Sequence, residues 1–135
     1  MASRPVNFPL NALQVRKTVK AASAATKYMP GVLDTDSDTV LDATAGQNAD
    51  VIFMATAAAG EEVACALLTG GCVLPVKVGT AGVTFGEYVE VGTTGVIDRT
   101  LGGGTTVRYI IGKALDTQVS ADIVGVAIGQ FASVS

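Results

Sequence analysis

The chain has 135 residues, of which 49% are hydrophobic and 16% charged, and its net charge at pH 7 is −3. Ala, Val, Gly and Thr are abundant, aromatic residues make up 5%, and neither Trp nor His occurs. Small and β-branched residues favour thin, tightly packed sheets, and a chain of this length suits one domain with its own core. The absence of His excludes Ser-His-Asp and Cys-His nucleophiles and His-ligated zinc sites. We therefore expect a β-rich protein with no enzymatic activity, metal or cofactor.

The first 27 residues differ in charge from the rest of the chain. Residues 1–27 hold five of the nine cations and no acid, whereas residues 28–135 carry a charge of −8. Because Pro5 and Pro9 keep the first ten residues extended, we expect a basic N-terminal arm over 1–27 and a body over 28–135. Such charge asymmetry is typical of an interaction tail. The candidate contact residues of the arm are Arg4, Val6, Phe8, Leu10, Leu13, Val15, Arg16, Lys17, Lys20 and Lys27.

Other interpretations of the basic arm remain open. It would also suit folding back onto its own acidic body, binding nucleic acid, or an organelle transit peptide. An acidic body and a single aromatic residue in the arm, Phe8, argue against nucleic acid. No stretch approaches the roughly 20 apolar residues that span a bilayer. We expect neither a nucleic-acid nor a membrane partner.

Beyond Tyr28 the sequence consists of short apolar runs separated by turn signals rich in Gly, Thr and Ala. Strands at this spacing are typical of a sandwich or small barrel. We predict an all-β fold: a small, compact β-barrel or sandwich, β-tulip-like, with an extended N-terminal arm. The predicted strands are Asp50–Ala55, Glu62–Leu68, Val73–Val78, Tyr88–Val91, Thr106–Ala114 and Ile123–Phe131, with shorter ones near Val40 and Val96.

One short unit recurs three times, at residues 60–66, 86–91 and 121–126. Each copy places a small residue and a carboxylate at a turn and then begins an alternation of period two. Because no catalytic group lies between the copies, the repetition indicates a structural surface and not an active site. Within these strands we expect Tyr88 and Glu90 to face water, the strand from Ile123 to be central, and Gly112 to mark a close backbone approach.

Several patterns suggest chemistry but lack required parts. Residues 34–38 resemble the opening of a calcium loop, but Thr39 and Ala45 stand where a Gly and a bidentate Glu belong. Residues 102–106 lack the Lys of a phosphate loop, and a strand follows them. The turn carboxylates are better explained as surface edges than as a glycosidase pair. Cys65 and Cys72 are expected to be reduced, half-buried thiols.

In the C-terminal half, a short β pattern runs through residues 83–91, 95–98, 111–115 and 122–128. In this pattern, which covers about 73–131 in order, the chain resembles the capsid cement, or head decoration, proteins of tailed bacteriophages. The family shows a progression of "G-[DE]-x-V-x-V", "G-x-[VI]" and "G-x-A" followed by an alternating strand. This chain departs from the family at residues 116–118, which are polar (Asp-Thr-Gln) rather than Gly-rich.

The resemblance implies a non-enzymatic virion protein on the outer face of the capsid. It implies binding to the major capsid protein, reinforcement of the coat lattice near local three-fold positions, and a homotrimer. The alternatives are a tail or baseplate adaptor, another virion adaptor, or a small β-barrel subunit that binds a ligand or acts as an enzyme.

Overall fold

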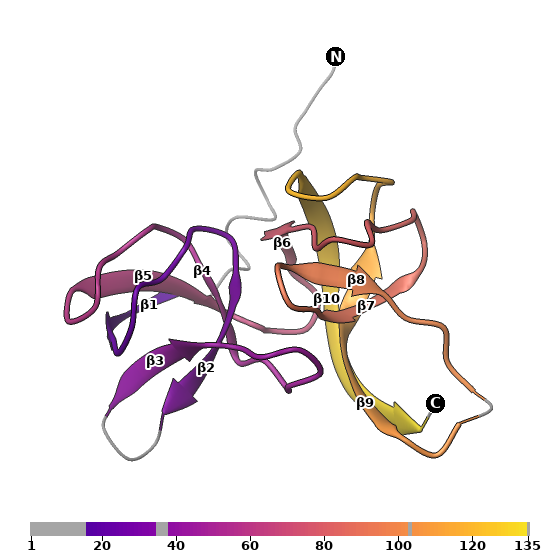
Figure 1. Ribbon diagram of the computed structural model, residues 1–135, viewed down its shortest axis with the longest axis horizontal. Coiled ribbons are helices and arrows are strands. Elements are labelled where there is room, and N and C mark those ends of the chain that lie inside the picture. The colour runs from indigo at the N-terminus through magenta and orange to yellow at the C-terminus, as the bar shows by residue number, and fades with distance from the viewer. Residues whose placement is uncertain (1–15, 35–37, 103, 135) are drawn as a thin grey trace.

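The computed structural model describes residues 16–34, 38–102 and 104–134, and every regular element in those ranges is a β-strand. Within them, no helix is present that could extend across a membrane. The strands form two five-stranded sheets that lie side by side (Figure 1). In chain order the strands are β1 (Arg16–Ala21), β2 (Pro30–Asp34), β3 (Thr39–Asp42), β4 (Val51–Phe53), β5 (Glu62–Leu67), β6 (Val73–Lys77), β7 (Tyr88–Val91), β8 (Val96–Asp98), β9 (Val107–Ala114) and β10 (Ile123–Val134).

Strands β1 to β5 close into a barrel, called barrel 1 below, in the order β1-β3-β2-β4-β5. β1 pairs antiparallel with β5 over residues 16–20, and it pairs parallel with β3 only at Lys20 and Ala21. All other pairings in barrel 1 are antiparallel. Small, β-branched and aromatic side chains fill its interior, as expected for a narrow barrel: Val19, Ala21, Ala25, Val40, Val51, Phe53, Ala57, Val63 and Cys65.

Strands β6 to β10 form the second sheet, in the order β6-β10-β9-β7-β8. A single parallel bridge between Val78 and Val96 joins its two edge strands, so the sheet curls into what we call barrel 2. We call the parallel contact that closes each barrel its seam; in barrel 2 a glycine allows the two strands to approach there. Gly95 has a φ of 148°, and a Cβ there would overlap the backbone of Lys77 and Gly79.

Barrel 1 and barrel 2 have the same topology. When β1 to β5 are replaced by β6 to β10, every pairing recurs with the same direction, including the parallel contact that closes the barrel. The chain is therefore a tandem repeat of one barrel, over residues 16–67 and 73–134. Matching backbone hydrogen bonds fix the alignment: Ala21 N–H to Glu61 O and Val78 N–H to Asp122 O, Ala22 N–H to Val40 O and Gly79 N–H to Val96 O, Tyr28 N–H to Phe53 O and Gly86 N–H to Ala114 O.

The repeat also explains the recurring turn unit. Four strands, β2, β5, β7 and β10, follow a corner residue with positive φ: Tyr28 (71°), Gly60 (87°), Gly86 (84°) and Ala121 (73°). Three of these corners lie in the three units found in the sequence; the fourth, at Tyr28, has a bulky residue in a conformation that costs an L-residue about 1 kcal/mol. An antiparallel bridge joins the two corners of each barrel, Ala25 to Ala57 and Val83 to Gln118.

At one pair of equivalent positions, the two cores place a large and a small side chain in reversed order. In barrel 1, Phe53 lies against Gly31, where a Cβ would be 2.6 Å from the ring atom Cζ. At the equivalent positions barrel 2 has Ala114 and Val89, both buried. A large residue on one strand is thus matched by a small one on its neighbour, and the sizes are reversed between the barrels.

Barrel 1 packs its outer wall against the core of barrel 2. Ile52 and Ala66, which are fully buried, belong to the same hydrophobic cluster as the interior of barrel 2. Hydrogen bonds cross the junction from Lys77 N–H to Tyr28 O (2.9 Å) and from Gln130 Nε2 to Ala49 O (2.6 Å). The two barrels therefore share buried surface in addition to their covalent link.

The structure confirms the all-β class and each predicted strand, with boundary shifts of a few residues. Three features go beyond the prediction. The chain forms two barrels, β1 and β2 are not among the predicted strands, and residues 16–27 of the expected arm belong to barrel 1. Residues 16–27 form β1 and the first corner, because β1 supplies the edge that closes the barrel.

Candidate interaction surface

The expected arm divides between described and undescribed residues. Arg4, Val6, Phe8, Leu10, Leu13 and Val15 lie outside the described residues. Of the others, Arg16, Lys17 and Lys20 belong to β1, and Lys27 belongs to the first corner, where its Nζ lies 4.9 Å from the Tyr28 ring centroid. The five cations thus do not form one free arm, since Arg4 is the only charged residue before β1.

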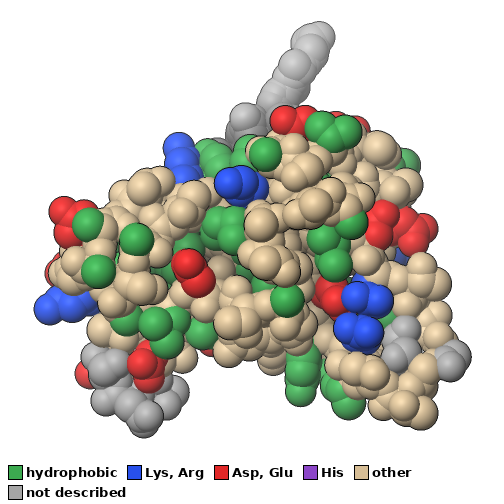
Figure 2. All heavy atoms as spheres, in the orientation of Figure 1, with side chains coloured by type: hydrophobic (Ala, Val, Ile, Leu, Met, Phe, Trp, Pro, Cys, Tyr) green, Lys and Arg blue, Asp and Glu red, His purple; other side chains and the backbone are tan. Residues whose placement is uncertain are grey.

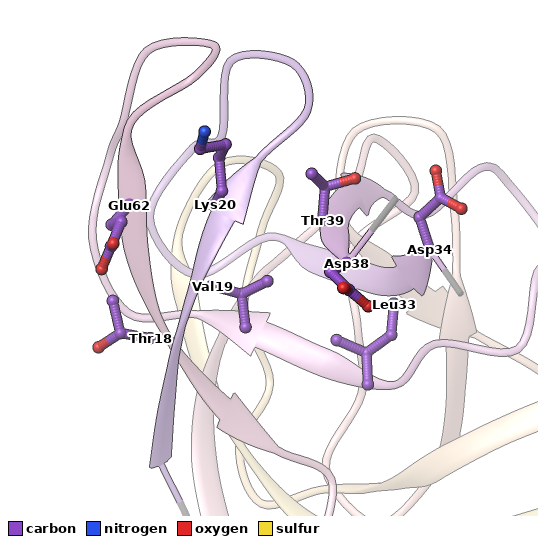
Figure 3. A pocket seen from close by; sticks show the side chains of 8 residues that line it. All are labelled: Thr18, Val19, Lys20, Leu33, Asp34, Asp38, Thr39 and Glu62. Carbon is purple, nitrogen blue, oxygen red and sulfur yellow. The ribbon is translucent and has the colours of Figure 1, made fainter. Parts of the chain in front are cut away.

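A groove opens at the seam of barrel 1, between β1 and the hairpin formed by β2 and β3 (Figure 3). It exists because β1 and β3 pair at only two positions, while barrel 2 is tight at the equivalent place. The groove has a volume of about 380 Å³. Figure 3 shows that Glu62 lies on the opposite side of β1 from Asp34 and Asp38, so the carboxylates do not converge.

The described residues show neither a cluster of metal ligands nor an exposed thiol. Among the described residues, no group of three or more Cys, Asp or Glu is placed to hold a metal ion. Cys65 and Cys72 are free thiols and fully buried, and burial raises the pKa of both. A buried thiol with a raised pKa is a poor nucleophile at neutral pH. The two cysteines are therefore packing residues.

The outer face of barrel 2 is more distinctive than the groove. It consists of outward side chains of β7, β9 and β10, which alternate with buried residues, and of Leu115 just after β9. Leu115 is 45% exposed, and Ile123 and Phe131 are each 40% exposed. An apolar patch of this kind on a small protein is typical of an interaction site. We define the outer face as Tyr88, Glu90, Lys113, Leu115, Ile123, Gly125, Ala127 and Phe131.

Aromatic contacts organise one end of the outer face. The rings of Tyr88 and Phe131 meet edge to face with centroids 5.2 Å apart, and Lys113 Nζ lies 4.9 Å from the Tyr88 ring centroid. Such contacts fix the orientation of rings and cation beyond simple burial. Phe131 therefore covers part of the face with the protein's own side chains.

A buried ion cluster lies beneath that end. Glu90 is only 3% exposed, and its Oε2 accepts from Arg99 Nη2 at 2.7 Å and lies 3.6 Å from Arg108 Nη1. The hydrogen bond to Glu90 raises the pKa of Arg99. Among the residues that the structure describes, the other carboxylate oxygen of Glu90 has no hydrogen-bond partner. The expectation that Glu90 faces water is wrong, because two arginines cover it.

A two-stranded ribbon extends beyond the outer face, and Val107 and Tyr109 lie on its opposite side, since Ile110 pairs with Phe131 and side chains alternate along β9. β9 and β10 have eight and twelve residues, whereas their counterparts β4 and β5 have three and six. Beyond a register shift between Ile128 and Phe131, the two strands pair with each other over residues 107–110 and 131–134. The ribbon extends below barrel 2 in Figure 1, and apolar side chains project at the same edge in Figure 2. Val107 and Tyr109 are exposed on it.

This surface is only partly indicated by the sequence. Ile123 and Phe131 were recognised as strand residues, but the strand from Ile123 was expected to be covered on both sides. The missed signal was the length of the two strands, since an eight-residue and a twelve-residue strand exceed what a narrow five-stranded barrel requires.

No protein-family model matches the chain, and no curated protein matches its sequence. Among solved structures, the fold is similar to that of the head fiber gp8.5 N base in bacteriophage phi29, with a TM-score of 0.68 and 15% sequence identity. The match covers 87% of this chain and 95% of that one. At this identity the likeness is one of fold, and it extends over nearly the whole of both chains.

Proposed function

We propose that this chain is a structural protein of a phage virion that binds the outer surface of the capsid and reinforces the coat-protein lattice. It acts as a homotrimer near local three-fold positions and has no enzymatic activity. Its partner is the major capsid protein. The observation that carries the proposal is the likeness in fold, over nearly its full length, to the base of a phage head fiber.

Two further observations support the same conclusion. The resemblance to cement proteins lies in residues 73–131, which correspond to barrel 2, and it was found in the sequence independently of the fold. In addition, the described residues contain no group of three or more Cys, Asp or Glu that could hold a metal ion, and both cysteines are buried, which favours a binding role over catalysis.

The position of β1 changes how the N-terminus would contribute to binding. Residues 1–15 of the sequence precede β1, and they have a single charged side chain, Arg4, together with apolar residues such as Phe8 and Leu10. Extended, this segment would span at most about 50 Å at roughly 3.3 Å per residue. Its contribution to capsid binding would therefore come mainly from apolar burial, with a weak dependence on salt.

Co-sedimentation with mature capsid shells built from the coat protein of the same virus tests the proposal. We expect saturable binding at a fixed ratio to coat protein, nearly unchanged between low and high salt. Failure to bind such shells at any ratio would refute the capsid role.

A matched variant lacking residues 1–15 separates the arm from the barrels. Because the deletion ends before β1, both barrels stay intact, as circular dichroism would verify. We expect weaker binding to the shells. Full occupancy by the truncated protein would assign attachment to the barrels alone.

A further inference from the structure

The tandem repeat shows how the outer wall of one barrel is covered. In barrel 1 the outward residues of β2, β4 and β5 face barrel 2: Ile52 and Ala66 are fully buried, and Val32, Met54 and Leu68 pack against the same cluster. The wall of barrel 1 is thus an interface with a second barrel of the same fold.

The same wall of barrel 2 is mostly uncovered. By the shared hydrogen bonds, Ile52, Met54 and Ala66 correspond to Lys113, Leu115 and Ala127. Lys113 and Leu115 are exposed and Ala127 is half-buried. Only the end near Tyr88 and Glu90 is covered, by Phe131 and the two arginines. The outer wall of barrel 1 is therefore buried within the chain, whereas the equivalent wall of barrel 2 is mostly exposed.

We propose that the outer face of barrel 2 binds barrel 1 of a second copy of this chain. The interface within the chain is of the head-to-tail kind, in which different surfaces of like units meet, and such contacts form rings when the rotation between units closes. The inference rests on the proposed function in one respect: it assigns the surface through which the trimer forms.

Charge and shape favour a second copy as the occupant. Lys113 is the one cation at the uncovered part of the face, and barrel 1 (residues 16–67) carries four cations and seven acids, a net charge of −3. Opposite charges steer and orient such an encounter. Gly125 and Ala127 on β10 have small side chains, as Ala64 and Ala66 have on β5. A second barrel can therefore approach the backbone of this strand closely.

Sedimentation velocity of the full chain tests the proposal over protein concentrations of about 1 to 100 µM, a range that covers micromolar dissociation constants. We expect a trimer, with three times the 13.6 kDa mass of the chain. Leu115→Asp places a charge at the centre of the face and is expected to shift the association midpoint at least about tenfold upward. Lys113→Glu is expected to act in the same direction by opposing the acidic barrel 1.

Val119→Asp is the matched control. Val119 belongs to the same barrel and is 69% exposed, but its counterpart Ala58 stays exposed in barrel 1, so it lies outside the expected contact. This variant should associate as the unchanged chain does.

Three results would overturn the inference: a monomer at all concentrations, an unchanged oligomer in Leu115→Asp, or equal loss in Val119→Asp. A monomer that loses shell binding through Leu115→Asp would assign the face to the coat protein. Because shell binding is measured separately by co-sedimentation, failure of self-association would leave the capsid role standing.

Discussion

Barrel 1 and barrel 2 have the same strands in the same pairings, yet they differ in three places. Barrel 1 has a longer β2–β3 hairpin with an open seam, whereas glycines close the seam of barrel 2. Barrel 2 has the ribbon and the buried ion cluster, and neither recurs among the described residues of barrel 1. The outer wall is covered in barrel 1 and mostly open in barrel 2.

The comparison separates what the fold requires from what was added to it. Two corners, the bridge between them and the parallel closing contact occur in each barrel, so they belong to the barrel itself. The ribbon occurs once, and the barrel closes without it. A feature that only one copy of a repeat possesses is therefore the better candidate for a specific role than a feature that both possess.

Exchanging the core residues of one barrel for those of the other tests the comparison most severely. Phe53→Ala alone should lower the free energy of unfolding by about 3–5 kcal/mol, since it leaves a cavity. Gly31→Val alone should also destabilise, because a Cβ at that position meets the Phe53 ring and Leu41 O. The double variant reproduces the Val89 and Ala114 pair of barrel 2 and should lose at least about 1 kcal/mol less than the sum.

Urea unfolding of the two single variants and the double variant measures this coupling. Strict additivity would show that the two positions do not share one space, and the reversed-size interpretation of the cores would then be wrong.

The seam of barrel 2 gives a smaller effect. Gly95→Ala should destabilise by about 2–3 kcal/mol, because the methyl group would overlap the backbone of β6. Gly60→Ala is the control: its φ is also positive, but no atom lies within 4 Å, so only backbone strain of about 1 kcal/mol is expected.

Amide hydrogen exchange localises the effect. In Gly95→Ala the Gly79 N–H, which donates to Val96 O across the seam, should exchange faster, whereas exchange in barrel 1 stays as before. Equal effects of Gly95→Ala and Gly60→Ala would argue against close packing at the seam.

The ion cluster gives the smallest expected change. Glu90→Gln keeps the shape of the side chain but removes its charge, so the hydrogen bond from Arg99 weakens. Because both arginines are 28% exposed, they can regain water, and the loss should be about 1–2 kcal/mol. Thermal unfolding measures the difference. A more stable Glu90→Gln protein would mean that the desolvation cost of burying the carboxylate exceeds the stabilisation that its two arginine partners supply.

Much of the fold could be predicted from the sequence because most strands alternate and end at glycine-rich turns. β2 was missed since it starts at Pro30 and Gly31, residues that normally interrupt strands; its Gly is required by Phe53, which lies 22 positions later in the sequence. β1 was missed because its cations suggested an arm, whereas its inward residues Val19 and Ala21 fill barrel 1.

The candidate surface was harder to predict for a physical reason. Whether Glu90 is buried depends on Arg99 and Arg108, which reach it from other segments. The repeat itself was hidden because the corners that align it carry Tyr, Gly, Gly and Ala, residues with little in common beyond their backbone angle. Hydrogen-bond register, which reveals the repeat, is a property of the folded chain.

The pairing of the first strand of each barrel with its last has a mechanical consequence. Arg16 lies opposite Ala66, so the chain enters and leaves barrel 1 at the same end. Tension applied between residue 16 and residue 67 would pull β1 and β5 apart from that end, one hydrogen bond at a time, because antiparallel ladder bonds lie across the strands. Load applied along the strands through the side walls would instead strain many bonds together. Barrel 1 would therefore resist force best when the load is applied along its strands.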